Sequence, residues 1–333
     1  MMRLPPFTYL APVSVADAVK LMADHGPEAM LVAGGTDLYP NMKRRQFEPT
    51  VLVGLRGVRD LVGVRQPGAG ALAIGAGTTL TAVARHPEVR ARYAALATAA
   101  GAVSTPQLRN MGTLGGNVCV DTRCNYYNQS YQWRKAVDFC MKKDGEICLV
   151  APGSPRCWAV SSSDTAPALW SLGASVRLAG PSGERTIPIS ALYQDDGIQY
   201  LTKQPGEIVT EIVLPPADGA RSVYLKLRRR GSFDFPVLGV AATLHMDGET
   251  VCQARIVLGA VASLPREAVQ AARLLVGERL TPELIDRAAD AAYRPAKPLD
   301  NTDLTHPYRK KMVRVYVARA LRRLAGLPEA AEA

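Results

Sequence analysis

The sequence lacks several features that would place a protein in a class directly. It contains no apolar run long enough to span a bilayer, so we expect no membrane insertion. Residues 1–15 are interrupted by prolines and have no apolar core, so we expect no secretory signal and a cytoplasmic location. Aromatic residues make up only 6% of the chain and do not alternate with the basic clusters. The net charge of +10 therefore indicates solvated faces, subunit contacts or an acidic protein partner, and no nucleic acid.

Cysteine is scarce and unevenly placed. Four of the six cysteines, Cys124, Cys140, Cys148 and Cys157, fall between residues 121 and 168. In a chain without an export signal they are expected to be reduced, which favours metal ligation over disulfides. The surrounding stretch is rich in turn-forming and charged residues and has no apolar period, so packing alone does not order it. Thiolates on a metal centre would order it, because metal binding also contributes folding free energy.

The spacing of these cysteines, C-x15-C-x7-C-x8-C, narrows the choice of metal. Structural zinc sites usually contain a close C-x2-4-C pair, and this stretch has neither such a pair nor a histidine. A [4Fe-4S] cluster held by four separated cysteines fits better, with zinc or unrelated buried thiols as the alternatives. Cys119 and Cys252 are expected to be packed thiols.

A glycine pair follows a short apolar segment near the N-terminus. Residues 30–33 are expected to form a buried strand, Gly34 and Gly35 follow, and a helix is expected to extend to Met42. In this arrangement backbone N–H groups can approach a phosphate. A structural turn capped by Thr36 or Asp37 is the alternative, since the spacing is not that of a Rossmann motif.

A second glycine-rich loop, residues 109–117, follows a helix expected over residues 89–101. Two such loops in one domain indicate that the pyrophosphate of a dinucleotide is held from both sides. The cysteine stretch comes directly afterwards, so its ligand is expected to lie near the dinucleotide. Thr78, before the second glycine-rich loop, and Asp164, after the cysteine stretch, are each expected to cap the start of a helix.

The last third of the chain follows a different pattern. Residues 215–219 are rich in proline and predict a linker, and Asp247-Gly248 predicts a hairpin turn. Strands are expected over residues 222–227, 237–245 and 251–262, and helices over residues 265–276, 282–293 and 305–324.

In their order and separation, these motifs resemble the FAD-binding medium subunits of the molybdenum hydroxylase family. Residues 33–38 and 110–117 are similar to its two FAD loops, residues 163–167 to its Asp-x-x-Pro element, and residues 224–230 to the basic strand that opens its C-terminal domain. The resemblance implies an α+β fold, with a two-part FAD-binding domain of the vanillyl-alcohol-oxidase/PCMH type before a C-terminal α+β domain that has a small antiparallel sheet and three helices. The implied units are residues 1–56, 57–216 and 220–327.

The chain departs from most relatives over residues 118–161, where they have only a few residues. This insertion is similar to the one in the β subunits of the 4-hydroxybenzoyl-CoA reductases, which holds a [4Fe-4S] cluster through four cysteines. The similarity implies that Cys124, Cys140, Cys148 and Cys157 are cluster ligands.

The resemblance also implies which residues contact FAD. The glycine amides would meet the pyrophosphate, Asp164 would make a polar contact to the FAD, and Lys226 would stabilise negative charge on the reduced flavin. The complete set is Leu31, Ala33, Gly34, Gly35, Thr36, Asp37, Leu38, Asn110, Thr113, Gly115, Gly116, Asn117, Asp164 and Lys226.

The function implied by the resemblance is electron transfer, with the substrate chemistry in a partner subunit. Electrons would pass from ferredoxin through the [4Fe-4S] cluster and FAD to [2Fe-2S] clusters in a small subunit and a molybdenum cofactor in a large subunit, where 4-hydroxybenzoyl-CoA would become benzoyl-CoA. The implied assembly is a dimer of heterotrimers. Two alternatives remain: a molybdenum hydroxylase that oxidises an aldehyde or N-heterocycle, and a zinc-stapled scaffold with a vestigial flavin site.

Overall fold

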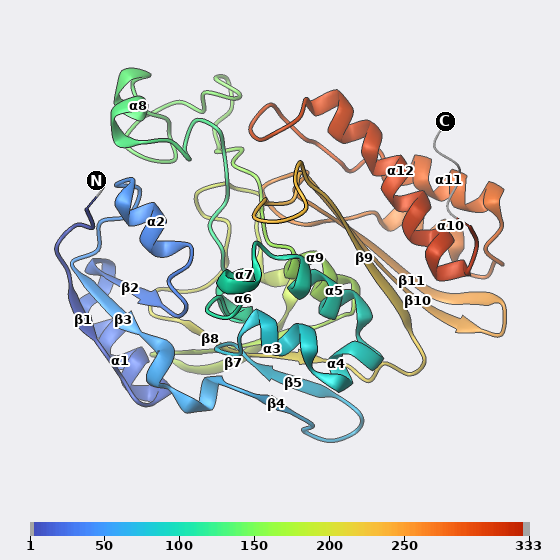
Figure 1. Cartoon of the computed structure of the whole chain (residues 1–333), viewed down its shortest axis with the longest axis horizontal. Coiled ribbons are helices and arrows are strands. Elements are labelled where there is room, and N and C mark those ends of the chain that lie inside the picture. Colours follow the sequence, from blue (N-terminus) through green and yellow to red (C-terminus); the bar gives the residue numbers. More distant parts are fainter. Residues whose placement is uncertain (1–2, 329–333) are drawn as a thin grey trace.

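The computed structural model describes residues 3–328, which form three β-sheets in succession along the chain (Figure 1). The first sheet has three parallel strands, the second has five antiparallel strands and the third has four antiparallel strands. Mixed α/β structure is therefore followed by an antiparallel sheet with helices, which is the predicted outline.

The first sheet has the strand order β1-β3-β2. All four residues of its central strand are buried, which is typical of a parallel strand covered on both faces. The first helix begins after Ser14, whose side chain accepts a hydrogen bond from the Asp17 amide at 3.0 Å. The elements are β1 (Thr8–Leu10), α1 (Val15–His25), β2 (Ala29–Val32), α2 (Leu38–Lys43) and β3 (Val51–Gly54).

The second sheet has the order β4-β5-β8-β6-β7 and packs its apolar face against helices. Its strands are β4 (Val64–Arg65), β5 (Leu72–Gly75), β6 (Ser175–Gly180), β7 (Gly183–Pro188) and β8 (Ile208–Leu214). Between β5 and β6 the chain forms α3 (Leu80–Arg85), α4 (Pro87–Arg92), α5 (Ala94–Ala102), α6 (Pro106–Arg109), α7 (Leu114–Val118), α8 (Tyr131–Ala136) and α9 (Thr165–Ser171). Short 3₁₀ helices lie at Gly26–Glu28, Leu55–Gly57, Arg59–Leu61 and Ile189–Leu192.

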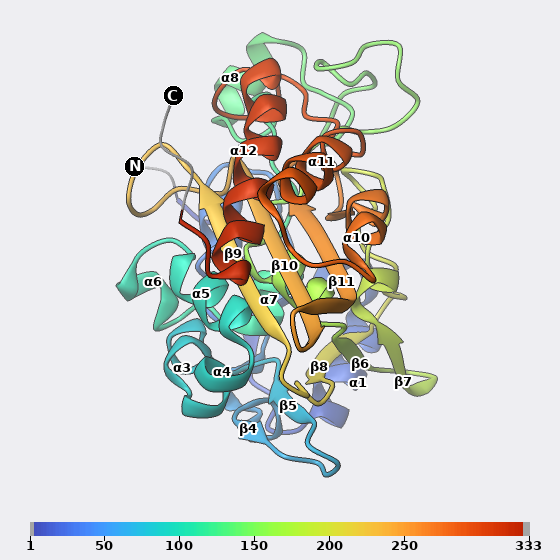
Figure 2. The same ribbon diagram turned by 90° about the vertical axis from the view of Figure 1, so that its right-hand side faces the viewer.

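The third sheet, of order β12-β11-β10-β9, is covered on both faces. Figure 2 shows α10, α11 and α12 across one face, and α5 and α9 pack against the other. The elements are β9 (Arg221–Leu227), β10 (Leu238–Asp247), β11 (Thr250–Gly259), β12 (Arg266–Glu267), α10 (Val269–Leu275), α11 (Pro282–Ala292) and α12 (His306–Ala325). Within residues 3–328, no helix combines the length and the hydropathy needed to cross a bilayer.

The cysteine-bearing insertion projects beside α2 and is mostly irregular (Figure 1). Its single α-helix is α8, and Asp138, Phe139 and Asp144 adopt positive φ angles within its turns. The insertion closes at its base through Arg123 and Val160, whose backbones exchange hydrogen bonds of 2.8 and 2.7 Å. This irregular backbone is consistent with the sequence of the insertion, which has no apolar period.

Three local predictions are wrong for identifiable reasons. The helix expected over residues 89–101 is broken at Tyr93, whose ring is buried and whose hydroxyl donates to the Pro215 carbonyl at 2.6 Å. Thr79 caps α3 instead of Thr78, because the Thr78 hydroxyl bonds the Gly63 backbone. The helix expected from residue 265 begins only at residue 269, since the preceding residues pair with β11 as β12.

Candidate functional site

A cavity of about 460 Å³ lies between the two glycine-rich loops, and we call it the inter-loop cavity. The first loop contributes the backbone that links β2 to α2, and the second contributes the turn into α7. The predicted FAD residues that line it are Leu31, Ala33, Gly34, Gly35, Thr36, Asp37, Leu38, Thr113, Gly115, Gly116 and Asn117. Two loops some 80 residues apart in the sequence are thus brought to one cavity, as a dinucleotide site requires.

Three glycines make this approach possible. A Cβ atom on Gly34 would lie 2.0 Å from the Met111 carbonyl oxygen, and one on Gly115 would lie 2.6 Å from the Ala76 Cβ atom. Gly35 has a φ of +68°, and its Cβ atom would overlap the Tyr39 ring. These glycines let the two loops pack closely against each other and against their neighbours, which shapes the wall of the cavity.

Hydrogen bonds fix the second loop from both ends. The Thr113 hydroxyl accepts from the Gly116 amide at 3.1 Å and caps α7. The Asn117 Oδ1 atom accepts from the Ser163 hydroxyl, the Thr165 amide and the Thr165 hydroxyl at 2.7 to 3.1 Å. The loop is therefore positioned by the start of α9, which comes after the insertion in the chain.

Asp37 connects the first loop to the base of the insertion. Its carboxylate forms an ion pair with Arg123 and accepts from the Asn41 side-chain amide at 3.0 Å, and it caps no helix amide. Burial lowers the pKa of Arg123 to about 10, and the guanidinium also lies 4.3 Å from the centre of the Phe235 ring. The inter-loop cavity and the insertion are consequently held in a fixed relation.

Three other predicted FAD residues are absent from the wall of this cavity within residues 3–328. The Asp164 carboxylate accepts from the Tyr224 hydroxyl at 2.7 Å and from the Lys226 ammonium at 2.9 Å, so it does not cap α9 as the sequence suggested. Burial raises the pKa of Asp164 and lowers the pKa of Lys226. The Asn110 side chain accepts from the Thr81 hydroxyl at 2.7 Å. The roles of these three residues at a flavin stay predictions.

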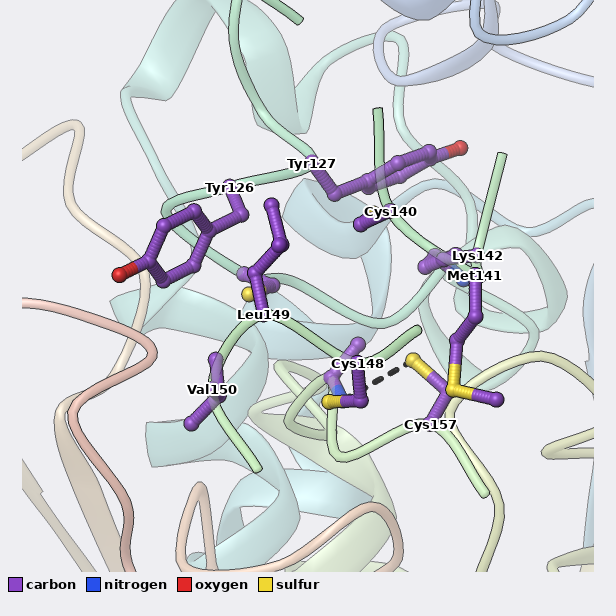
Figure 3. Close-up of a pocket in the computed structure, with 11 residues that line it drawn as sticks. Tyr126, Tyr127, Cys140, Met141, Lys142, Cys148, Leu149, Val150 and Cys157 are labelled. Carbon is purple, nitrogen blue, oxygen red and sulfur yellow. Dashed lines mark hydrogen bonds between the residues drawn. The ribbon is translucent and has the colours of Figure 1, made fainter. Parts of the chain in front are cut away.

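The four cysteines of the insertion line one small cavity, the cysteine cavity (Figure 3). Cys124, Cys140, Cys148 and Cys157 are all buried, and they come from four separate points of the loop. Figure 3 labels Cys140, Cys148 and Cys157 among mainly apolar and aromatic neighbours. The other lining residues are Tyr126, Tyr127, Met141, Lys142, Leu149, Val150 and Ala159.

Among the residues that the structure describes, no three cysteine, histidine or carboxylate side chains are placed to hold a single metal ion. The four thiols line one cavity, and within residues 3–328 no nitrogen or carboxylate ligand of a metal lines it with them. Four thiolates can hold an iron-sulfur cluster or a structural zinc ion, so the [4Fe-4S] cluster stays a prediction. Burial raises the pKa of Cys124 to about 12 and that of Cys157 to about 11, so a metal centre would displace thiol protons as it binds.

Two family comparisons cover nearly the whole chain. Residues 5–217 match the FAD binding domain in molybdopterin dehydrogenase, and residues 222–324 match the CO dehydrogenase flavoprotein C-terminal domain. The chain belongs to the molybdopterin dehydrogenase flavoproteins. It is an FAD-binding medium subunit of the molybdenum hydroxylase type, as the resemblance predicted.

Individual relatives agree with this assignment. The carbon monoxide dehydrogenase medium chain of Afipia carboxidovorans is 32% identical over 95% of this chain and 96% of its own. The aldehyde oxidoreductase FAD-binding subunit PaoB of Escherichia coli is 35% identical over 78% of this chain and 82% of its own. A solved carbon monoxide dehydrogenase from Hydrogenophaga pseudoflava superimposes with a TM-score of 0.80 at 31% identity, over 96% of this chain and 98% of that one. The individual FAD contacts and the cluster ligands stay predictions.

The sequence did not reveal several residues on the wall of this flavoprotein's FAD cavity. Tyr200, Lys203 and Phe235 line it from segments far from either glycine loop, and Cys119 and Asp121 line it from the start of the insertion. Cys119 was expected to be a packed thiol, and burial does raise its pKa. Tyr200, Lys203 and Phe235 belong to no recognisable local motif, so only the tertiary fold identifies them.

The insertion is anchored to the FAD-binding part by buried polar contacts. Arg134 is a buried residue of α8, and its guanidinium donates to the Arg44 and Arg45 carbonyls at 3.0 Å each. The Gln46 side-chain amide donates to the Tyr127 carbonyl at 2.5 Å. These bonds link the residues after α2 to the wall of the cysteine cavity, so the loop is ordered by more than its own turns.

Gly197, which lies outside the insertion, packs against Cys157. Its amide donates to the Cys157 carbonyl at 2.9 Å, and a Cβ atom there would lie 2.7 Å from the Cys157 Sγ atom. We expect Gly197→Ala to displace Cys157 and to lower iron and acid-labile sulfide content while FAD stays bound. The matched control is Gly153→Ala, because a Cβ atom at Gly153 meets nothing within 4 Å. Equal iron content in both variants would contradict a ligand role for Cys157.

Proposed function

We propose that this chain is the electron-transfer subunit of a molybdenum enzyme of the 4-hydroxybenzoyl-CoA reductase type. Electrons from a low-potential donor, with ferredoxin as the proposed one, pass through a [4Fe-4S] cluster and FAD toward [2Fe-2S] clusters and a molybdenum cofactor. The proposed partners are a small [2Fe-2S] subunit and a large molybdenum subunit in a dimer of heterotrimers in the cytoplasm.

The observation that supports this proposal is the position of the cysteine cavity. Its four buried thiols lie beside the FAD cavity, because Asp121 lines the FAD cavity and Cys124 lines the cysteine cavity. Only Thr122 and Arg123 separate them in the chain. A four-thiol site at this place gives a medium subunit a second redox centre next to its flavin.

The protein's own part in such a reaction is to bind, orient and shield. A flavin exchanges electrons singly or in pairs, which suits a subunit between unlike redox centres. The backbone of the first loop near Gly34 would hold the pyrophosphate, since the Gly115 and Gly116 amides already donate to the Ala76 carbonyl and the Thr113 hydroxyl. Arg123 fixes this first loop against the insertion through Asp37. Tyr126, Tyr127 and the aliphatic lining of the cysteine cavity exclude water from the thiols.

Two structural details belong to the same proposal. The FAD-binding part is of the vanillyl-alcohol-oxidase/PCMH type, with subdomains at residues 1–56 and 57–216, and the C-terminal domain spans residues 220–327. Asp164 and Lys226 form a buried ion pair next to α5 and α9. In the complex with FAD, the proposed role of Asp164 is a polar contact to the FAD, and that of Lys226 is to stabilise negative charge on the reduced flavin.

A second candidate is a molybdenum hydroxylase that oxidises an aldehyde or an N-heterocycle. It is favoured by relatives of this chain, which include an aldehyde oxidoreductase subunit of Escherichia coli and the nicotinate dehydrogenase FAD-subunit of Eubacterium barkeri. In that enzyme the cysteine site would be an exit for electrons.

Assays of the complete complex separate these candidates. The chain is produced anaerobically with its co-purifying subunits, and the complex is supplied with reduced ferredoxin and 4-hydroxybenzoyl-CoA. Formation of benzoyl-CoA, with little oxidation of aldehydes or N-heterocycles in the presence of an electron acceptor, is the expected result. Oxidation of those substrates without any benzoyl-CoA formation would overturn the reductase proposal in favour of the second candidate.

A further inference from the structure

A buried ion pair lies between the two cavities. The Lys142 ammonium is 2.8 Å from the Asp121 Oδ1 atom, and their side chains are only 6% and 7% exposed. Lys142 lines the cysteine cavity, whereas Asp121 lines the FAD cavity. The positive end of the pair therefore borders the thiols and the negative end borders the flavin site.

The ammonium is held in place by several groups at once. Besides Asp121, it donates to the Thr122 hydroxyl at 2.9 Å and to the Gly197 carbonyl at 2.6 Å. It also lies 4.8 Å from the centre of the Tyr127 ring and 5.7 Å from that of Tyr200. One ring lines the cysteine cavity and the other lines the FAD cavity, so the charge has a fixed position between them.

Asp121 is only partly satisfied by these contacts. Its Oδ1 atom accepts from Lys142 and from the Thr122 amide at 2.9 Å. Its Oδ2 atom is buried and has no hydrogen-bond partner among the described residues. A buried carboxylate oxygen without a partner is costly, and a donor on a bound ligand would remove that cost.

The charge of Lys142 reaches the thiols. Lys142 lines the cysteine cavity together with all four cysteines, so its positive charge lies beside their sulfur atoms. Charges act strongly across short distances when water is excluded. The net charge around an iron-sulfur cluster is one of the factors that set its reduction potential.

We propose that Lys142 and Asp121 form an electrostatic bridge that sets the reduction potentials of both redox centres together. The inference rests on the proposed function, since it requires a cluster in the cysteine cavity. Lys142 is a positioning residue here: it stabilises the added electron at the cluster and compensates the Asp121 carboxylate, which would otherwise oppose reduction of the nearby flavin.

Because the charges are paired, removing either one leaves the other uncompensated beside both centres. Lys142→Met is expected to lower the midpoint potentials of the cluster and of FAD. Asp121→Asn is expected to raise both. The double variant, in which the bridge has no net charge, is expected to return both potentials toward those of the unaltered protein.

The test is a redox titration of the anaerobically purified holoprotein, with the cluster followed by electron paramagnetic resonance and FAD by absorbance. Lys143→Met is the matched control, since Lys143 is 33% exposed and pairs with Asp144 at 3.0 Å. Iron and sulfide are measured in every sample. Opposite shifts in the two single variants, and none in the control, support the bridge.

The measurements distinguish a failure of the proposed function from a failure of the electrostatic bridge. Absence of iron and sulfide from the unaltered protein overturns the proposed function, and the inference with it. A loaded cluster whose potential is the same in Lys142→Met and in Lys143→Met overturns the inference alone. If Lys142→Met loads no cluster, the titration is repeated in the Cys140→Ala background, where an unchanged FAD potential overturns the bridge and a lowered one supports it.

Discussion

Cys140→Ala is expected to abolish iron and acid-labile sulfide binding while leaving FAD in place. Cys140 lies at a tight turn in which its carbonyl accepts from the Lys143 and Gly145 amides, so its sulfur is positioned by local backbone bonds. Alanine preserves this turn but removes one of four thiols from the cysteine cavity. Since that residue does not line the FAD cavity, the flavin spectrum is expected to persist after the iron-sulfur absorbance is lost.

Cys252→Ala provides the matched control for this prediction. Cys252 is exposed on β11, where its thiol lies 3.2 Å from the His245 carbonyl oxygen, and it lies outside the cysteine cavity. Iron, sulfide and FAD are measured per chain in both variants after anaerobic purification. Undiminished iron in Cys140→Ala would rule out this residue as a ligand.

Gly34→Ala is expected to release FAD. The added Cβ atom would lie 2.0 Å from the Met111 carbonyl oxygen and 2.6 Å from its carbon, so the two glycine loops must move apart. Overpacking of this kind costs about 1–3 kcal/mol. Because about 1.4 kcal/mol is a factor of ten in affinity, we expect FAD to bind roughly 10- to 100-fold more weakly. Equilibrium titration of the FAD-depleted protein measures this change.

Gly101→Ala tests whether the effect is specific to the loop contact. Gly101 lies in α5, and its Cβ atom would meet only the Ala84 Cβ atom at 3.8 Å, an ordinary contact. Alanine is the better helix former, so FAD affinity and thermal stability are expected to be kept or slightly raised. If both glycine variants bound FAD as the unaltered protein does, the inter-loop cavity would not be the flavin site.

The glycine loops and the cysteines could be predicted because their signals are local. Gly34 and Gly115 are recognisable from the residues beside them, and the structure brings both loops to one cavity. The cysteines stand out because their surroundings lack any apolar period, and the structure accordingly builds that segment with little regular backbone. In both cases the residue type itself carries the chemistry.

Other parts of the site depend on contacts between distant segments. Nothing local in the sequence pairs Lys142 with Asp121, because a lysine in a charged stretch is normally solvated. Asp164 does lie at the start of α9, but its carboxylate accepts from Tyr224 and Lys226, some 60 residues away, and does not cap the helix. Buried polar groups choose partners by tertiary position, which spacing along the chain does not reveal.

The break in the helix at Tyr93 shows the same limit for the fold. Its flanking residues favour a continuous helix, yet the buried ring and the bond from its hydroxyl to Pro215 redirect the backbone. The outline of the C-terminal domain was predictable because the apolar segments of β10 and β11 flank the Asp247-Gly248 turn, and because the helical spacing of α11 and α12 repeats over many residues.

The most direct test of the account is to determine the metal content and Mössbauer spectrum of the anaerobically purified, unaltered chain. The account predicts iron and acid-labile sulfide in equal amounts, about 4 of each per chain, with the spectrum of a [4Fe-4S] cluster alongside bound FAD. Stoichiometric zinc, or FAD without iron and sulfide, would contradict it.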